Sequence, residues 1–441
     1  MSSITGGVDG LGVRFDDGSL VADAGLVLAG TVMARLGLEA LIDEAVRPPE
    51  SGRGSGAKAL SAAASMLVGG SFIDDANRLR SGSAEGVLPF AVSAPSTLGT
   101  WLGSFRWGHV RQLDRAQELA LSRAWSVGAA PRVSEVTVDV DSTVCEVHGR
   151  AEQGAAYGHT GVLGYHPLVA VRDDTGEILH TRMRKGSSQS GQRHFIVETL
   201  TRLKRLEPDA AVTVRADAGF FSYGTLDALD AKDASYSVTI PQSSNVKAAI
   251  EAIEDEARAP IGCTDDGIAQ VAETTITTGP RSRSAECRAL RLVVRRTRLA
   301  GPQRALWPDW RHHAFVTNRT DLDTTAADAC HRAHARVELA IRDLKDNGLA
   351  HCPSGKFAAN AAWLACAALA HNIARWCARL GRAQHPRRLT TAATLRRRLL
   401  NIPGRIVNHS GRNILRLPAD WPWTHTFTQA LKHIRNLPQI V

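Results

Sequence analysis

The chain of 441 residues is poor in several residue types, and each shortage excludes a class of protein. Its seven cysteines are odd in number and never form Cys-x-x-Cys, so neither a disulfide framework nor a zinc site is indicated. Aromatic residues make up only 5%, with four tyrosines, which is unfavourable for a sugar-binding cleft. Lysine is scarce as well, so arginine supplies most of the 53 basic residues.

Long hydrophobic runs are also missing. A long uncharged run, Phe357 to Ala374, has 18 residues, but it is mostly alanine and includes Asn360, His371 and Asn372. Such a segment favours a buried helix over a membrane span. The N-terminal MSSITGGVDG lacks the basic and then apolar pattern of a signal segment. We therefore expect a cytoplasmic protein.

Positive charge is abundant but unevenly distributed. The formal net charge is +9, and apolar residues make up 44%, which excludes a largely disordered chain. Residues 1–50 carry eight acidic and three basic residues, whereas residues 375–441 carry thirteen basic residues and one acidic residue. A tail this basic requires a polyanion, or an acidic surface elsewhere in the protein or in a dimer partner.

The residue pattern changes twice along the chain. Apolar spacing predicts helices over 25–45 and 58–68, and from Pro95 toward Trp125. From Val133 the period becomes two, and three strands, a helix over 192–206 and the strand AVTVRAD predict an α/β fold with a mixed sheet. Further strand patterns lie between 225 and 330. A helix over 326–346, the uncharged run and the basic tail complete the chain.

Three acidic positions lie where α/β proteins place ligand sites. In VTVDVDST, Asp139 and Asp141 point to one face of a strand, an arrangement that a nearby cation makes favourable. Asp217 follows AVTVRA, at the carboxyl end of a strand. Glu338 lies on a helix whose stripe carries His331, His334, Arg342 and Lys345. Each pattern alone also fits a structural role: an exposed strand position, a helix cap or a surface ion pair.

Taken in this order, these residues resemble the DDE transposases of bacterial insertion sequences, most closely the insertion-sequence 1380 group, which is related to the insertion-sequence 4 group. The matching stretches are VDVDSTVCEVHGR, GAAYGHTGVLGYHPLVAV, RADAGFFS and HARVELAIRDLKDNGL. The resemblance implies an RNase H-like mixed-sheet catalytic core with a β-rich insertion. A helical N-terminal domain would precede this core, and a helical, basic C-terminal region would follow it.

The resemblance and the shifts in composition together predict five segments. Residues 1–130 form a helical domain for DNA-end binding or dimerisation, and residues 131–224 form the first part of the catalytic core. Residues 225–325 form the insertion, and residues 326–375 supply the final helices of the core. Residues 376–441 form a basic region for DNA binding or dimerisation.

Carried over residue by residue, the resemblance implies that Asp141, Asp217 and Glu338 are the catalytic residues and the ligands of two Mg²⁺ ions, with Mn²⁺ able to substitute. Asp139 is a reserve metal ligand. A two-metal site of this kind hydrolyses a phosphodiester at the transposon end. The same site then transfers the freed 3′-hydroxyl into target DNA, because only the attacking oxygen has changed.

The implied partner is double-stranded DNA, both the terminal inverted repeats and the target, bound by a homodimer in a synaptic complex. Candidate DNA-binding residues come from the helix stripe, the basic tail and two tryptophans that would stack on bases. They are Lys345, Arg342, His334, Arg387, Arg388, Arg396, Arg397, Arg398, Trp307 and Trp310. His331 and His334 occupy the positions of a tyrosine and an arginine in related transposases, which is a departure from the family pattern.

Two alternatives stay open at the level of the sequence. Paired carboxylates also serve glycosidases, but the basic tail and the scarcity of tyrosine fit that class poorly. A catalytically decayed, transposase-derived protein that only binds DNA would keep the basic segments. The three acidic positions are intact, which favours an enzyme. Metal-dependent DNA cleavage distinguishes these classes.

Overall fold

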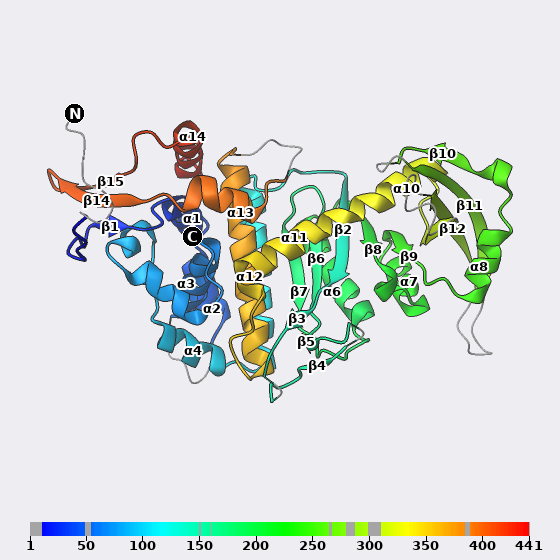
Figure 1. Ribbon diagram of the computed structural model, residues 1–441, viewed down its shortest axis with the longest axis horizontal. Coiled ribbons are helices and arrows are strands. Elements are labelled where there is room, and N and C mark those ends of the chain that lie inside the picture. The colour runs from blue at the N-terminus through cyan, green and yellow to red at the C-terminus, as the bar shows by residue number, and fades with distance from the viewer. Residues whose placement is uncertain are drawn as a thin grey trace.

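The computed structural model describes residues 11–48, 54–149, 151–158, 160–263, 267–278, 287–298, 310–383 and 389–440. The chain forms a mixed α/β structure in which one nine-stranded sheet runs from the centre of the molecule to one end (Figure 1). Helices from both ends of the chain gather at the other end. The predicted α/β class with a mixed sheet is confirmed.

One side of the sheet, from the edge strand β7 to β9, is formed by strands that the sequence pattern predicts. In spatial order they are β7 (Ile178–Arg182), β6 (Leu168–Arg172), β2 (Glu135–Ser142), β8 (Ala211–Ala216) and β9 (Ser235–Thr239). Strand β2 pairs antiparallel with β6 and parallel with β8, and β8 pairs parallel with β9. Val136, Val138 and Val140 of β2 are buried, so this alternation fixes which face of the strand carries the acidic residues.

Four antiparallel strands extend the same sheet beyond β9. They are β13 (Arg311–Thr317), β12 (Arg288–Arg298), β11 (Ile268–Thr278) and β10 (Ala259–Ile261). The insertion is therefore continuous with the core sheet. Strand β9, which lies inside the insertion predicted at 225–325, pairs with β8 on one side and with β13 on the other. A strand pattern shows burial but not the identity of the neighbouring strands, so the sequence did not indicate that β9 joins the two parts of the sheet.

Two helix predictions in the N-terminal part need correction. Its α-helices are α1 (Leu26–Arg35), α2 (Leu38–Ala45), α3 (Ser55–Leu67), α4 (Pro95–Gly103) and α5 (Trp107–Ser126), with 3₁₀ helices over Ile73–Arg80 and Ala84–Val87. The single helix predicted over 25–45 breaks at Gly37, which has a left-handed φ of 57°. The helix predicted from Pro95 onward breaks before Trp107, because Arg106 is extended and its N–H donates to His109.

The uncharged run is a buried helix, as predicted. Helix α12 (Phe357–Leu380) is long and apolar enough to span a membrane, but 89% of its most apolar window is buried inside the protein. It packs against α3, α5 and β7 and so joins the N-terminal helices to the sheet. The helix continues through residue 375, where the sequence placed a domain boundary.

The C-terminal region is not wholly helical, which corrects the prediction. Besides α13 (Ala392–Leu395), a π-helical turn (Arg396–Leu400) and α14 (Thr424–Arg435), it contains a hairpin of β14 (Gly404–His409) and β15 (Arg412–Arg416). Ser410 and Gly411 both have positive φ, as a two-residue hairpin turn requires. Strand β14 also pairs with β1 (Leu20–Val21), and Arg405 contacts Asp17 at 2.5 Å. The two ends of the chain are thus packed together.

The remaining elements frame the sheet. Helix α6 (Gln192–Leu206) connects β7 to β8, and α7 (Tyr223–Asp230) and α8 (Ser244–Glu251) follow, with 3₁₀ turns over Ala218–Phe220 and Asp255–Ala257. A small sheet contains β3 (Cys145–Glu146), β5 (Leu163–Tyr165) and β4 (Ala156–Tyr157). One helical run consists of α10 (Thr324–Arg332), a 3₁₀ turn (Ala333–Arg336), α11 (Val337–Leu344) and a π-helical turn (Lys345–Leu349). It crosses from the insertion to α12 (Figure 1).

Candidate active site

Two of the predicted acidic residues lie side by side at the carboxyl ends of parallel strands. The paired register of β2 and β8 ends at Val140 opposite Ala216. The next residues are Asp141 and Asp217, so continuing this register places them opposite each other. The Asp141 carboxylate accepts a hydrogen bond from the Ser142 N–H at 2.6 Å. Asp217 accepts one from the Gly219 N–H at 3.1 Å and so caps the following 3₁₀ turn.

The third acidic residue comes from the helical run. Glu338 lies in the first turn of α11, and this helix packs against β2 and β6. The buried residues Val337, Ala340 and Leu344 hold α11 against the sheet, whereas the Glu338 side chain is exposed. Glu338 therefore reaches the region of β2 from outside the sheet, on a long and adaptable side chain.

The electrostatics of Asp141 show that the three carboxylates influence one another. Its pKa is raised to about 6, first by burial and also by the charges of Asp217 and Glu338. The Ser142 hydrogen bond and the charge of His334 act in the opposite direction. Negative charge is therefore concentrated at this point of the sheet, which a bound cation would stabilise.

The donor type and charge of these residues fit a hard divalent cation. Carboxylate oxygens are the ligands that Mg²⁺ prefers, and three carboxylates balance the charge of one or two such ions. Among the residues that the structure describes, no group of three or more His, Cys, Asp or Glu side chains is arranged to hold a metal ion. Binding would therefore require the side chains, above all the exposed Glu338, to close around the ion.

Asp139 has a different environment from the other three. Both of its carboxylate oxygens accept hydrogen bonds from Arg215, at 2.7 and 2.8 Å, and it is fully buried. A third hydrogen bond joins it to His334 at 2.9 Å. A carboxylate with both oxygens engaged by a guanidinium has little capacity left for a metal. We therefore leave Asp139 out of the metal ligands proposed below.

Arg184 is a cation beside the site that sequence reasoning missed. It is buried, and its Nε donates to the His166 carbonyl at 2.9 Å, while His166 Nε2 lies 3.0 Å from Ser142 Oγ. Burial lowers the pKa of Arg184, and the charge of Asp217 opposes this shift. Arg184 lies in MRKGSSQSG, a stretch that also resembles the transposase family, but this resemblance did not single out Arg184 as a site residue.

The helix stripe that flanks Glu338 divides into two parts. Arg342 is exposed and Lys345, at the start of the π-helical turn, is half-buried, so both can face a ligand. His331 is buried, with its ring nitrogens 2.7 Å from Ser237 Oγ and 3.0 Å from Thr239 Oγ1 of β9. Burial, with neighbouring positive charges, lowers the pKa of His331 to about 3. His331 is thus a structural contact between α10 and the sheet.

The arginines of the tail also differ in exposure. Arg397 and Arg398 are exposed, and the Arg398 guanidinium lies 5.6 Å from the centre of the Trp423 ring. Arg396 is instead directed into the protein, where its Nε donates to the Leu67 carbonyl at 3.1 Å and its Nη2 contacts Asn347. Arg396 therefore joins the tail to the N-terminal helices. The predicted DNA-binding residues Arg387 and Arg388 lie outside the described residues.

Of the two tryptophans predicted to stack on bases, only Trp310 is among the described residues, and Trp307 lies outside them. The Trp310 ring packs against two arginines of β12. The guanidinium carbons of Arg296 and Arg298 lie 4.2 and 4.8 Å from the ring centre. These cation–π contacts hold the ring in place and surround it with positive charge.

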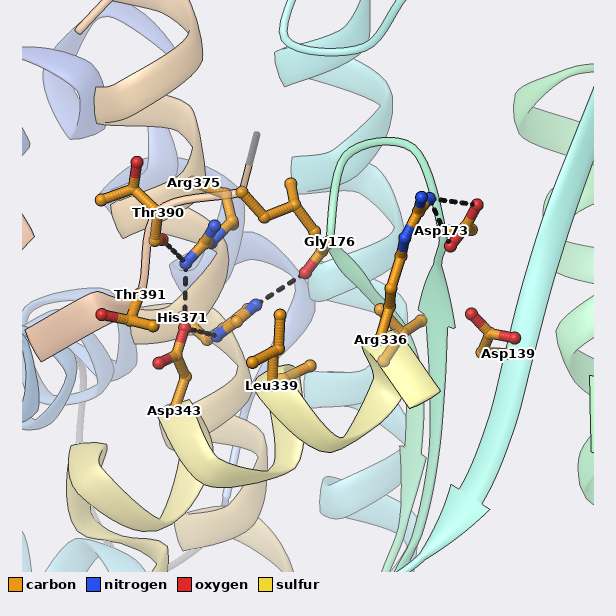
Figure 2. Close-up of a pocket in the computed structure, with 13 residues that line it drawn as sticks. Asp139, Asp173, Gly176, Arg336, Leu339, Asp343, His371, Arg375, Thr390 and Thr391 are labelled. Atoms are coloured by element: carbon orange, nitrogen blue, oxygen red, sulfur yellow. Dashed lines mark hydrogen bonds and ion pairs between the residues drawn. The ribbon is translucent and has the colours of Figure 1, made fainter. Parts of the chain in front are cut away.

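A buried ion pair anchors the helix that carries Glu338. Asp343 of α11 contacts Arg375 of α12 at 2.9 Å (Figure 2). Asp343 also accepts a hydrogen bond from the Ala392 N–H at 3.0 Å. His371 Nε2 lies 2.7 Å from the Gly176 carbonyl in the β6–β7 turn. The cavity between these groups measures about 10 Å³, the size of one water molecule, so it is a packed junction rather than a ligand site.

The fold and this site together define an α/β protein with an acidic centre at the carboxyl ends of its central strands. The family described as "Transposase DDE domain group 1" matches residues 7–439. The chain therefore belongs to this family and is a DDE transposase, a class of DNA-acting enzymes that generally use divalent metal ions. The prediction of a DDE transposase is confirmed.

Comparisons with individual proteins add less. No curated protein sequence matches the chain. Among solved structures, the chain is similar to piggyBac transposase in a synaptic complex with hairpin DNA, with 10% sequence identity and a TM-score of 0.41. The match covers 95% of this chain and 83% of that one. At this sequence identity and TM-score, neither the ligand nor the activity of that protein can be assigned to this chain.

Proposed function

We propose that this transposase belongs to a bacterial insertion sequence of the 1380 group. It binds the terminal inverted repeats, hydrolyses the DNA at the transposon ends and joins the freed 3′-hydroxyl to target DNA. Residues 131–239 and 326–375 form an RNase H-like core for this reaction. The observation that supports the proposal most strongly is geometric: Asp141 and Asp217 lie at the carboxyl ends of two paired parallel strands, and Glu338 lies on the helix that packs against β2.

In this proposal Asp141, Asp217 and Glu338 are the ligands of two Mg²⁺ ions, with Mn²⁺ as a substitute. Bound ions of this kind lower the pKa of water and neutralise charge on the phosphate and the leaving oxygen. The chain itself orients the site. The Gly219 N–H fixes the Asp217 carboxylate, the Ser142 N–H fixes that of Asp141, and Arg184 supplies a positive charge beside them.

The DNA would lie along the exposed basic groups near this site. Arg342 and Lys345 follow Glu338 on the same helical run, and Arg397 and Arg398 lie in the C-terminal region. Phosphate contacts from such residues position the duplex without reading its sequence. Two transposon ends must be held together for a coupled reaction, so we propose a homodimer in the synaptic complex.

Cleavage of DNA carrying the element's own ends tests this function. Short inverted repeats in the DNA on both sides of the reading frame would supply the substrate. The full-length protein with Mg²⁺ is expected to cut at the repeat boundary and leave a 3′-hydroxyl, and chelation of the metal is expected to stop cleavage. Specific binding without any cleavage in Mg²⁺ or Mn²⁺ would instead identify a catalytically decayed, DNA-binding transposase.

The role of the tail is tested by removing its two exposed arginines. The double substitution Arg397→Ala and Arg398→Ala is expected to weaken DNA binding about tenfold. It should also lower the slope of log affinity against log salt by about 1.8, because each phosphate contact contributes about 0.9. Electrophoretic or fluorescence titrations at several salt concentrations measure both quantities.

The control for this experiment removes the same charge elsewhere. Arg132 and Lys232 are exposed and lie just before β2 and in the turn after α7. Their double alanine variant is expected to keep the slope of the unmodified protein. An unchanged slope for the tail variant, or an equal loss in the control, would rule out a specific role for Arg397 and Arg398.

A further inference from the structure

Each of the three elements that carry a proposed metal ligand has a second polar residue one structural repeat before it. On β2, Asp139 precedes Asp141 by two residues, and on β8, Arg215 precedes Asp217 by two. On the helical run, His334 precedes Glu338 by four residues. Two residues along a strand and four along a helix both return to the same face. Asp139, Arg215 and His334 therefore form a second set of residues, each on the same face of its element as the proposed ligand and next to it along that face.

Asp139 contacts both of the other two residues directly. Asp139 and Arg215 are opposite each other in the parallel register of β2 and β8. Arg215 Nε and Nη2 donate to the two oxygens of Asp139 at 2.7 and 2.8 Å, in the bidentate geometry that fixes both position and orientation. The His334 Nδ1–H donates to Asp139 Oδ1 at 2.9 Å. One carboxylate thus joins all three elements.

Further contacts of Arg215 extend this connection. Its Nη1 donates to the Cys330 carbonyl at 2.8 Å, at the end of α10, and its Nη2 lies 2.8 Å from Asp173 in the β6–β7 turn. Asp173 in turn contacts Arg336 of the helical run at 3.0 Å (Figure 2). The helical run is therefore held to β8 and to the turn independently of His334.

Asp139 and Arg215 are buried and paired with each other, so neither of these two side chains faces DNA or solvent ions. The Asp139 and Arg215 side chains are 0% and 3% exposed, and that of His334 is 16% exposed. Burial alone would lower the pKa of Arg215, but the hydrogen bond and charge of Asp139 raise it above its usual value. A buried ion pair of this kind contributes little net stability, but it specifies one arrangement of the elements that carry it.

We propose that Asp139, Arg215 and His334 are positioning residues that set the spacing of Asp141, Asp217 and Glu338 for divalent cations. This inference rests on the proposed function. The three ligand side chains are not preassembled, so their backbones must be held at the correct separation while the side chains close on the metal. Removal of residues that orient metal ligands without binding the metal typically weakens metal affinity 10- to 100-fold.

His334 offers the sharpest test, because one substitution keeps its contact and another removes it. In H334N the side-chain amide places an N–H near the position of Nδ1, so the bond to Asp139 is kept. In H334L a side chain of similar breadth lacks the donor. The control is R332L, on the same helical run, since Arg332 is partly exposed and pairs with Asp328 rather than with Asp139.

Binding of Mn²⁺ to the full-length protein without DNA is the primary measurement, made by electron paramagnetic resonance of the free ion. H334L is expected to weaken Mn²⁺ binding about tenfold, whereas H334N and R332L stay within about threefold of the unmodified protein. In cleavage assays, the Mg²⁺ concentration at half-maximal rate should rise in H334L in parallel. Affinity for DNA in the absence of metal should not change.

Several outcomes would overturn the proposal. Equal Mn²⁺ binding by H334L and the unmodified protein would do so, as would a loss of DNA affinity with metal binding intact, which would make His334 a DNA contact. If H334L does not fold, H334Q replaces it, because its amide is displaced by one carbon from that of H334N. Equal metal binding by these two variants would then contradict the proposal. Absence of any metal-dependent cleavage by the unmodified protein would instead reject the proposed function.

Discussion

The substitution Asp217→Asn is expected to reduce metal-dependent cleavage of end-containing DNA by at least about 10³-fold. DNA affinity should stay within about twofold of that of the unmodified protein. The amide keeps the size of Asp217 and can still accept the Gly219 N–H bond. It loses the negative charge that a divalent cation requires. Gel assays of nicking, with binding measured on the same DNA, record both quantities.

Asp233 provides the matched control for this substitution. It is exposed in the turn after α7 and has a φ of 53°, a conformation that asparagine adopts readily. The Asp233→Asn variant is expected to cleave DNA like the unmodified protein. Full activity of the Asp217→Asn variant would remove Asp217 from the site, and loss of DNA affinity together with activity would indicate a folding defect.

The substitution Arg375→Met is expected to lower the free energy of unfolding by about 3–5 kcal/mol. It leaves Asp343 buried without its cationic partner and leaves the Thr390 carbonyl without a donor (Figure 2). Burial already raises the pKa of Asp343, and the charge of Arg375 opposes that shift. Unfolding by urea, followed by circular dichroism, measures the loss.

A second substitution separates an unpaired charge from a simple loss of packing. Combining Arg375→Met with Asp343→Asn removes the uncompensated charge but keeps an acceptor for the Ala392 N–H, so we expect most of the lost stability to return. Arg379→Met, one turn later on α12, is the control. Arg379 donates to a backbone carbonyl, Ala129, and its loss should cost about 1 kcal/mol. Equal stability of the single and double variants would contradict the ion-pair explanation.

Features with a local pattern could be predicted from the sequence. Helix α6 spans Gln192–Leu206, the predicted range, because its apolar spacing is uninterrupted. Strand β2 was predicted from alternating valines, and its acidic residues lie on the opposite face, as expected. The hairpin turn at Ser410 and Gly411 also has a local signal, which the helical C-terminal region implied by the resemblance did not take into account.

Features that depend on contacts between distant segments could not be predicted. The sequence makes Asp139 a reserve metal ligand, but in the structure it is an ion-pair partner, because Arg215, 76 residues later, donates hydrogen bonds to both of its carboxylate oxygens. Arg184 and Asp217 influence each other only because the fold of the chain between them brings them together. The pairing of Asp343 with Arg375 joins two helices whose individual patterns show only that they are amphipathic or buried. Charge and period identify the elements, but not which charged groups meet.

The central claim is that Asp141, Asp217 and Glu338 hold divalent cations at one point of the fold. Replacement of Mg²⁺ by Fe²⁺, followed by ascorbate and peroxide, generates hydroxyl radicals that cut the backbone only near the bound metal. The account predicts three sets of cuts, around residues 141, 217 and 338, all suppressed by excess Mg²⁺. Cuts confined to other segments, or diffuse cuts that Mg²⁺ does not suppress, would contradict it.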